Sequence, residues 1–257
     1  MRHKPIRLVR SWRSAVVEVL TFALVAPIAS FGDLAVGERR GTWNRPGRST
    51  VLGLMSACLG IDRQDDEMQE ALSRGYRVAI LCRASGLLLA DYHTTQVPPK
   101  KKGQRLATRA EELAQPQSDL STIVTRRDYR VGAWHLAGVV AVKEARWPLD
   151  HIEEAIRKPA FTTYLGRKSC PLGLPMSPMI ISAEDVAAAL LERNAHGPEA
   201  KFFQSFVRDA EPTRLVIDMA DVVPGDSRHR RTELRRDSPL SRRRWQFELR
   251  HEAVLEP

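Results

Sequence analysis

Three stretches in the first two thirds of the chain alternate apolar and polar residues with the period of a β-strand. They cover residues 16–26, 76–83 and 129–143. Between the first two, residues 49–60 repeat apolar side chains at helical spacing, and a second helical pattern covers residues 65–73. Because each pattern has one apolar face that needs a partner, the strands are predicted to form a sheet that packs against the helices.

Further elements complete this order. Residues 86–91 are predicted to be the hairpin partner of residues 76–83, and a helix capped by Asp150 ends at Pro159. Residues 92–128 interrupt the pattern, with one short helical possibility at 105–114. A connection this long is usually functional or disordered. The order β-α-β-β-insertion-α-β predicts an α+β fold, with a ferredoxin-like or RNA-recognition-type domain over residues 15–174.

The remainder, residues 175–257, is predicted to be a smaller, strand-bearing C-terminal unit. A helix over 182–193 is expected to open with Ser182 and Asp185, and strands are expected at 214–223 and 245–250. The intervening residues 228–244 contain eight arginines but only two acids, Glu233 and Asp237. They are interpreted either as a flexible basic loop near a polyanion or as an ordinary solvated hairpin tip.

Charge and cysteine content limit the class of protein. Forty Lys and Arg residues against 31 Asp and Glu residues give a net charge of +9, which favours a polyanionic partner such as nucleic acid. The three cysteines, Cys58, Cys82 and Cys170, lack metal-ligand spacing, so reduced core thiols in a cytoplasmic protein are expected. Residues 1–14 are expected to be a disordered basic leader, and no membrane-spanning segment is predicted.

The first candidate site is the stretch from residue 39 to residue 61, where a basic loop precedes a helix. Arg45 and Arg48 come just before Ser49, which, like Thr50, can cap the helix. Free N–H groups, the helix dipole and these arginines together suit a phosphate. The alternative is a capped core helix with solvated arginines.

The second candidate site is residues 161–172, FTTYLGRKSCPL. Tyr164 offers a ring for base stacking, while Arg167, Lys168 and Ser169 offer partners for phosphates or 2′-hydroxyls. The alternative is a plain basic turn.

Catalytic motifs are sparse. The chain has no Walker loop, nucleophile elbow or zinc-protease motif, and no paired carboxylates for two-metal chemistry. One exception is Tyr92 and His93, followed by Lys101, because a His or Tyr with a Lys can cleave RNA without a metal. The alternative for His93 is a structural role at a strand end, and His135 is expected in the core or on a sheet face.

Several motifs together resemble one family. They are A-P-I-A-S-F-G at 26–32, R-P-G-R-S-T-V-L-G-L-M-S-A-C-L-G-I at 45–61, D-Y-H-T at 91–94, R-D-Y-R at 127–130 and T-Y-L-G-R-K-S-C-P-L at 163–172. This set resembles the CasD subunits of type I-E CRISPR Cascade complexes, within the repeat-associated mysterious protein superfamily. The resemblance covers about residues 16–249.

The resemblance implies a ferredoxin-like body with a β-hairpin thumb at about residues 92–128, and a non-catalytic subunit of an antiviral ribonucleoprotein. Such a subunit holds the 5′ handle of the crRNA, caps one end of the Cascade backbone, and meets target DNA only through the complex. Its protein partners are the backbone subunit and the large subunit, and no cofactor or metal is expected. A type I-C-like endoribonuclease acting on pre-crRNA through Tyr92, His93 and Lys101 remains the alternative.

Combined with the residue patterns, the resemblance assigns two sets of contacts. The RNA-binding residues are predicted to be Arg45, Arg48, Ser49, Arg126, Arg127, Arg130, Tyr164, Arg167, Lys168 and Ser169. The thumb and partner contacts are predicted to be Tyr92, His93, Thr94, Lys100, Lys101 and Lys102.

Overall fold

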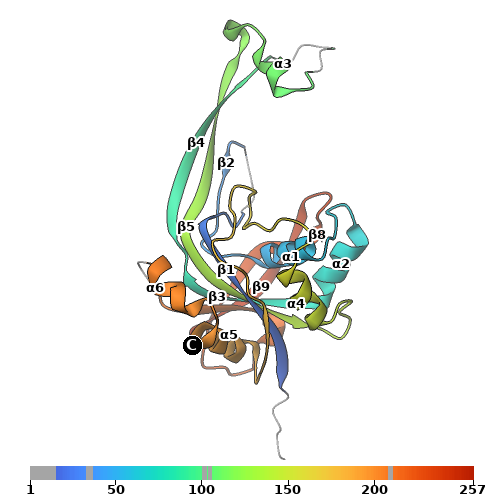
Figure 1. Cartoon of the computed structure of the whole chain (residues 1–257), viewed down its shortest axis with the longest axis vertical. Coiled ribbons are helices and arrows are strands. Elements are labelled where there is room, and N and C mark those ends of the chain that lie inside the picture. The colour runs from blue at the N-terminus through green and yellow to red at the C-terminus, as the bar shows by residue number, and fades with distance from the viewer. Residues whose placement is uncertain (1–15, 33–36, 100–102, 104–105, 208–210) are drawn as a thin grey trace, which may run out of the picture.

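The computed structural model of the protein describes residues 16–32, 37–99, 103, 106–207 and 211–257. One mixed but mainly antiparallel sheet of nine strands forms its body, and a long hairpin protrudes from it (Figure 1). The strand order is β6-β1-β5-β3-β7-β9-β8, with β2 and β4 also paired to β5. The predicted leader and residues Lys100, Lys101 and Lys102 lie outside the described residues.

The strands are β1 (Val17–Ala29), β2 (Arg39–Arg40), β3 (Tyr76–Ala84), β4 (Leu87–Val97), β5 (Ser121–Ala141), β6 (Met179–Ala183), β7 (Arg214–Asp218), β8 (His229–Ser241) and β9 (Gln246–Leu255). The helices are α1 (Arg48–Cys58), α2 (Asp66–Gly75), α3 (Arg109–Leu113), α4 (Leu149–Arg157), α5 (Val186–His196) and α6 (Phe203–Phe206). Short 3-10 turns are η1 (Gln117–Asp119), η2 (Ala200–Phe202) and η3 (Met219–Asp221). Each helix in the described chain is too short or too polar to cross a membrane.

β5 is the central strand, and its 21 residues have two environments. Its C-terminal half pairs with β1 on one edge and with β3 on the other. Its N-terminal half pairs with β4 from Leu87↔Val131 to Val97↔Ser121, so that β4 continues along the edge that β3 occupies. The sequence had predicted that residues 86–91 are the hairpin partner of residues 76–83. That prediction is wrong, because these residues pair with β5. β3 and β4 instead lie end to end, separated by Ser85 and the left-handed Gly86 (φ +73°).

The outer part of β4 and β5 forms the protruding hairpin, which we call the thumb (residues 87–131). Figure 1 shows it extending well beyond the sheet, with α3 near its tip. The expected thumb insertion is thus a paired hairpin, and the short helix expected at 105–114 is α3.

Two apolar layers hold the body together. α1, α2 and α4 cover one face of the sheet, where Phe22, Met55 and Ile152 belong to one buried cluster. α5 covers the other face, where Trp134 and Leu190 belong to a second cluster. Neighbouring residues of a strand point to opposite faces of the sheet. Because helices cover both faces, the central strands carry apolar side chains on both sides, and β1 is therefore an almost continuous apolar run.

The start of α1 differs from the prediction. Gly47 is the N-cap residue and no side chain of the helix caps it, so the expected cap by Ser49 or Thr50 is wrong. The free first-turn donor is instead satisfied from a distant strand, because the backbone N–H of Arg48 donates to Asp237 Oδ2 at 2.7 Å. A carboxylate of the protein itself therefore lies at the helix N-terminus, where a phosphate had been expected.

Two other helix starts also differ. Pro148 precedes α4, so Asp150 lies in its first turn and is not the cap. Asp185 caps α5 by accepting a hydrogen bond from the N–H of Ala188 at 2.7 Å, whereas Ser182 belongs to β6. The helices themselves lie where the sequence placed them.

Residues 228–244 are mostly strand, which corrects their interpretation as a loop. β8 pairs with β9 along its length, and its alternation buries Arg235 and Asp237 against the α1 side. The strands β6, β7, β8 and β9 belong to the same sheet as β1. The division of the chain at residue 174 stays a prediction, and one sheet crosses it.

Candidate nucleic-acid interface

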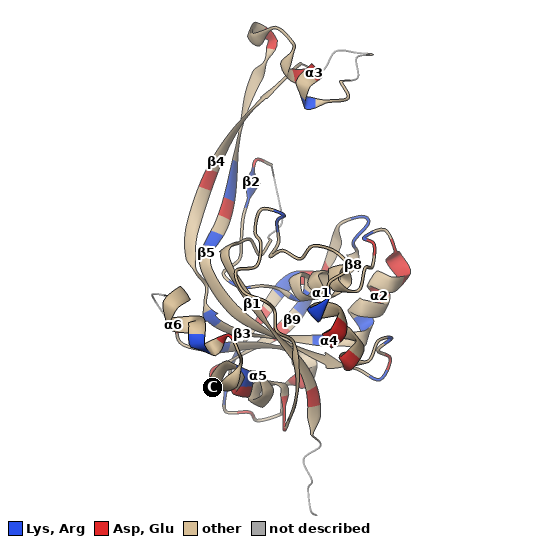
Figure 2. Cartoon of the chain, viewed as in Figure 1, with Lys and Arg blue, Asp and Glu red and all other residues tan. Residues whose placement is uncertain are grey.

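Arginines gather where the thumb leaves the sheet. β2 runs parallel to β5 there, with Arg39 in register with Arg126 and Arg40 in register with Arg127. Figure 2 shows the basic positions of β2 and β5 next to each other at this level of the thumb. The sequence predicted Arg126 and Arg127 as RNA contacts but did not assign Arg39 or Arg40 to the same place.

Asp128 organises these arginines. Its carboxylate, only 2% exposed, accepts hydrogen bonds from Arg39 Nη2 at 3.0 Å and from Arg126 Nε at 2.9 Å. Burial by itself would raise the pKa of Asp128, but the two guanidinium groups outweigh it and hold that pKa below its ordinary value. Asp128 therefore stays ionised at neutral pH and fixes two arginines that remain partly exposed.

The second predicted site docks onto this base. Tyr164 and Pro171 form a β-bridge, which closes the loop between them, and Leu165 O accepts a hydrogen bond from the N–H of Ser30 at 3.0 Å. Gly166 adopts φ +91°, and a Cβ atom there would lie 1.6 Å from Ser30 O. Only glycine allows this close approach, so the loop is held against the end of β1.

Arg167 connects the loop to the thumb. Its guanidinium donates to the carbonyl oxygens of Asp128 at 3.2 Å and Arg40 at 3.0 Å, and lies 4.5 Å from the ring centroid of Tyr129. The structure thus brings together the predicted residues Arg126, Arg127, Arg130, Tyr164, Arg167, Lys168 and Ser169.

Some of these cations are available to a ligand. Arg40, Arg127 and Lys168 are exposed, and their side chains make no ion pair with any described residue. Ser169 is exposed beside Lys168. A surface of fixed arginines with further unpaired cations around them suits the phosphates of a single-stranded nucleic acid.

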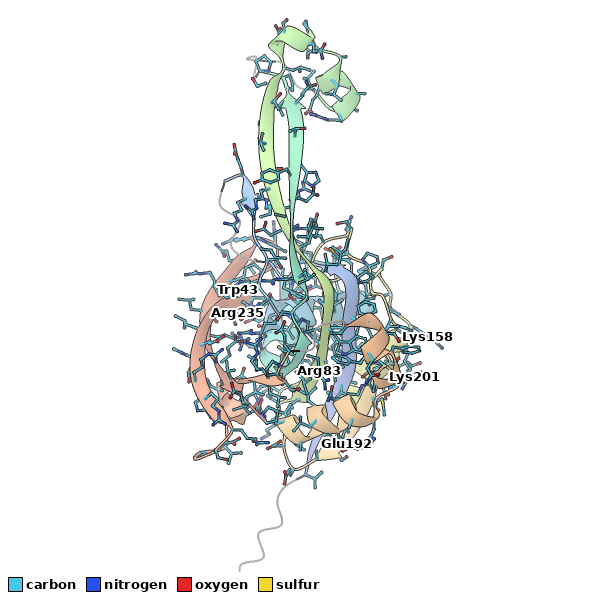
Figure 3. All side chains as sticks on the ribbon, turned by 90° about the vertical axis from the view of Figure 1, so that its left-hand side faces the viewer. Trp43, Arg83, Lys158, Glu192, Lys201 and Arg235 are labelled. Atoms are coloured by element: carbon cyan, nitrogen blue, oxygen red, sulfur yellow. The ribbon has the colours of Figure 1, made fainter. Side chains whose placement is uncertain are left out.

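Trp43 belongs to the same region and was missed by the sequence reasoning. Its side chain is 40% exposed, and its carbonyl oxygen accepts a hydrogen bond from Arg130 Nε at 3.2 Å. Arg235 lies beneath the ring, 5.0 Å from its centroid, as Figure 3 shows with both residues labelled. A tryptophan within a basic, glycine-containing loop was the available signal, because such a ring can stack on a base.

The Arg45 and Arg48 side chains face the protein, and Ser49 is half-buried. Arg45 Nη2 lies 2.6 Å from Glu233 Oε2 and 2.5 Å from Glu252 Oε1. Arg48 donates to Tyr76 O at 2.9 Å and also to Ser73 O. The carbonyl oxygen of Ser49 accepts from Arg242 Nη2 at 2.6 Å.

A buried charge network therefore joins the start of α1 to β8 and β9. Burial lowers the pKa of Arg235 to about 10, although the Asp237 and Glu252 carboxylates oppose it. For Arg45, burial acts in the same direction, but Glu252 outweighs it and the pKa is raised. Both arginines remain charged at neutral pH, and their partners are carboxylates and carbonyl oxygens of this chain.

Tyr92 and His93 lie on β4 at the level of the arginine cluster. Tyr92 is paired with Arg126, and His93 with Thr125, so the two side chains point to opposite faces of the hairpin. Tyr92 is 65% exposed with Arg126 5.9 Å from its ring centroid, and His93 Nε2 lies 2.5 Å from Asp91 Oδ2. Thr94 follows them in β4.

No group of three or more His, Cys, Asp or Glu side chains is arranged to hold a metal ion within the described ranges of the chain. Cys58, Cys82 and Cys170 are buried free thiols, as the sequence predicted. His135 is completely buried, and neither of its ring nitrogens has a hydrogen-bond partner among the described residues.

Comparison with known proteins identifies the family. A model of the family described as CRISPR-associated protein (Cas_Cas5) matches residues 19–252. The chain belongs to this Cas5 family. The match spans the thumb and most of the β8–β9 hairpin, so every strand of the sheet lies wholly or mostly within the Cas5 region.

Individual relatives agree with the Cas5 assignment. The chain is 33% identical over 180 residues to the CRISPR system Cascade subunit CasD of Escherichia coli (strain K12), covering 67% of this chain and 75% of the relative. The resemblance to CasD drawn from the motifs is thereby confirmed.

Two solved structures share the fold. One, described as a CRISPR RNA-guided surveillance complex, matches with a TM-score of 0.58 and 20% identity, over 92% of this chain and 89% of that chain. The other, described as a Cas protein, has a TM-score of 0.53 and 22% identity, over 93% of this chain and 95% of that chain.

Proposed function

We propose that this Cas5-family chain is the crRNA-binding subunit of a type I-E Cascade surveillance complex, in which it holds the 5′ handle of the crRNA and caps one end of the backbone. The arginine cluster at the base of the thumb, ordered by Asp128 and joined to the 163–172 loop, is the observation that carries the proposal. The similarity to the Cascade subunit CasD supports the choice of complex.

The strand order supports a ferredoxin-like body. The elements β1, α1, β3, β5, α4 and β6 follow one another as β-α-β-β-α-β, and their strands lie in the order β6-β1-β5-β3 with antiparallel neighbours. That arrangement is the one expected of two interleaved β-α-β units. We propose that β7, β8 and β9 are the strand-rich C-terminal addition to it.

The RNA contacts follow from exposure. Arg127, Lys168 and Ser169, with Arg40, would meet phosphates and sugars, while Arg126, Arg130 and Arg167 are held in place to present a fixed positive surface. Tyr164 and Trp43 supply rings for unstacked handle bases. Arg45, Arg48 and Ser49 act through the protein, because their contacts hold the loop that carries Trp43.

The thumb is proposed as the contact with the neighbouring backbone subunit, with the large subunit nearby and target DNA reached only through the complex. Its exposed apolar side chains support this, because Leu87, Leu88, Tyr92, Ile123 and Val124 each expose at least 39% of their surface. A cytoplasmic location follows from that assembly.

The role is proposed to be non-catalytic. Tyr92 and His93 point to opposite faces of the hairpin, so they would not act together on one phosphate, and a metal-independent ribonuclease would have to use one of them with a Lys. Lys101, the third member of that hypothesis, lies outside the described residues.

The test is crRNA retention by the assembled complex in a salt titration. The triple variant Arg40→Gln, Arg127→Gln and Lys168→Gln should lower retention, and its slope of log affinity against log salt should fall by about 0.7 for each lost phosphate contact. The matched triple variant Arg146→Gln, Arg157→Gln and Lys158→Gln removes the same charge from residues near or in α4 and should leave that slope unchanged.

Two results would contradict the proposal. One is an equal loss of retention in both triple variants, which would reduce the interface to bulk charge. The other is cleavage of repeat RNA by the isolated protein in EDTA, abolished by His93→Ala, which would establish the endoribonuclease alternative.

A further inference from the structure

A cavity of about 390 Å³ lies on the sheet face opposite α1, between α5, the η2–α6 segment and the central strands. Its walls come from the end of β3, from β5 and from the helices. The lining residues that matter here are Arg83, Trp134, Asn194, Lys201, Phe203 and Gln204. Figure 3 shows Arg83 and Lys201 on the α5–α6 side of the molecule, whereas Trp43 and Arg235 lie on the β8–β9 side.

Arg83 brings an uncompensated positive charge into this cavity. Its one side-chain hydrogen bond goes to a neutral partner, from Nη1 to Asn194 Oδ1 at 3.0 Å, and it makes no ion pair with any described carboxylate. Its Nε atom is buried and has no hydrogen-bond partner in the described chain. Arg83 is half-buried, and such a guanidinium with no ion-pair partner is stabilised by an anion.

Glu199, the acidic residue in the cavity wall, does not neutralise Arg83. Glu199 is buried, and both of its carboxylate oxygens accept hydrogen bonds from Arg193, at 2.9 and 2.7 Å. Lys201 adds a second, exposed cation at the same cavity, 5.0 Å from the ring centroid of Phe202. The cavity therefore has two cations that no lining carboxylate neutralises.

The remaining walls suit a planar ring. Phe203 lies edge-on to Trp134, with 5.2 Å between ring centroids, and the Arg83 guanidinium lies 4.2 Å from the Phe203 centroid. The carboxamides of Asn194 and Gln204 add donors and acceptors of the type that pair with base edges. The volume falls within the range of small-molecule sites, roughly 300–1,000 Å³.

We propose that this cavity binds a nucleoside monophosphate, with the base against Phe203 and the carboxamides and the phosphate between Arg83 and Lys201. The ligand is either a free mononucleotide or the phosphorylated end of an oligonucleotide, since both present the same chemical group. The site is separate from the interface at the base of the thumb, and it does not require the proposed crRNA role.

Isothermal titration of the full-length, RNA-free chain tests the proposal with AMP as the probe. Saturable binding at one site is expected, with adenosine and inorganic phosphate each at least about tenfold weaker because each lacks half of the recognised groups. Lys201→Gln and Arg83→Gln should each weaken AMP binding by about tenfold, the usual effect of losing one charge-assisted hydrogen bond.

Matched variants separate this effect from general loss of charge. Lys158→Gln removes a lysine outside the cavity, and Arg146→Gln removes an arginine that also lies over an aromatic ring, 5.6 Å from the Trp147 centroid. Both should bind AMP like the unmodified chain. A 5′-phosphorylated tetraribonucleotide that competes with AMP, where its 5′-hydroxyl form does not, would identify the chain end as the source.

Absence of saturable AMP binding to folded protein overturns the proposal, as does equal weakening by Lys201→Gln and Lys158→Gln. Binding of inorganic phosphate as tight as that of AMP would also overturn it, since the site would then recognise an anion alone. Lys201 is exposed, so Lys201→Gln keeps the test decisive even if Arg83→Gln unfolds the chain.

Discussion

Asp128 shows how much of the interface depends on one residue. It is an acid inside a basic cluster, and it holds Arg39 and Arg126 in one geometry while its own side chain is buried. Net charge and preorganisation therefore make opposite predictions for its removal. Without the carboxylate the surface is more positive, but the two guanidinium groups lose the hydrogen-bond acceptor that they share.

We expect Asp128→Asn to weaken crRNA binding by about fivefold, roughly 1 kcal/mol, because ordering the arginines matters more than adding one charge. The folded chain should also lose about 1–3 kcal/mol of stability. Filter binding with crRNA measures the first effect, and urea unfolding measures the second. Tighter binding in the variant would show that bulk charge controls the affinity.

Gly166 offers a second test at the same scale. Gly166→Ala would place a Cβ atom 1.6 Å from Ser30 O, whereas at Gly225, which has a similar φ of +80°, nothing lies within 4 Å. Both substitutions carry the cost of a left-handed alanine, about 1–2 kcal/mol. Gly166→Ala should cost a further ~1–3 kcal/mol in urea unfolding because Ser30 or the loop must shift. Equal costs would contradict the close contact.

Residue types were enough to find the arginines of the thumb base and the 163–172 loop, but not to separate surface arginines from buried ones. Arg45 and Arg48 look like phosphate ligands because they precede a helix. Their burial depends on Glu233 and Glu252, which are 188 and 207 positions away from Arg45, and on Asp237. No local pattern reports such partners, so the structure was needed to place these arginines inside.

At the scale of elements, alternation located strands such as β1, β3 and β5, but it did not identify their partners. Residues 86–91 follow 76–83 so closely that a hairpin between them was the simplest prediction. The left-handed Gly86 instead lets β4 continue along β5. The 21 residues of β5 are long enough to pair with both β3 and β4 on the same edge. The β8 strand was missed because most of its residues are polar or charged and it contains Pro239, although Arg235 and Asp237 alternate as inward-facing residues.

The thumb makes a prediction at this scale. Replacing residues 97–121 with Asn-Gly joins Gln96 to its register partner Thr122 through a two-residue turn. We expect the free energy of unfolding to be nearly unchanged, within about 0.5 kcal/mol, because the removed segment lies at the far end of the thumb, where Arg109 donates to Gln96 O of the thumb itself. Co-purification with the backbone subunit should be lost. A shortened chain that unfolds much earlier would show that the tip stabilises the body.

At the scale of the whole molecule, one sheet unites the N-terminal and C-terminal halves, and buried charges join its β8–β9 edge to the start of α1. Asp237 contacts Arg48, Arg235 and Arg250 from three elements. Burial alone would raise the pKa of Asp237, but Arg250 and the other donors outweigh it and lower that pKa. Its ionised form therefore stabilises the fold above the ordinary pKa of an aspartate, and this stabilisation is lost only as the pH falls through the lower folded value.

His135 makes the stability of the fold depend on pH at higher pH values than Asp237 does. Burial, reinforced by Arg45, Arg214 and Arg235, lowers its pKa from 6.5 to about 3. Below pH 6.5 the unfolded chain takes up a proton that the folded chain refuses, so the folded state loses stability as the pH falls. The slope is about 1.4 kcal/mol for each pH unit, and it ends near the folded value.

Between pH 6.0 and 4.5 the carboxylates of Asp128 and Asp237 stay ionised. Burial raises the pKa of Asp221, whereas at Glu233 the neighbouring arginines outweigh burial and lower the pKa. The His135 contribution is therefore the difference between the unmodified chain and His135→Leu across this window. We expect the free energy of urea unfolding to fall by about 2 kcal/mol across it. In His135→Leu, which fills the same buried position without a titrating group, the fall should largely disappear. The exposed His151→Gln variant should keep it. An unchanged slope in His135→Leu would mean that another group carries the pH dependence of the fold.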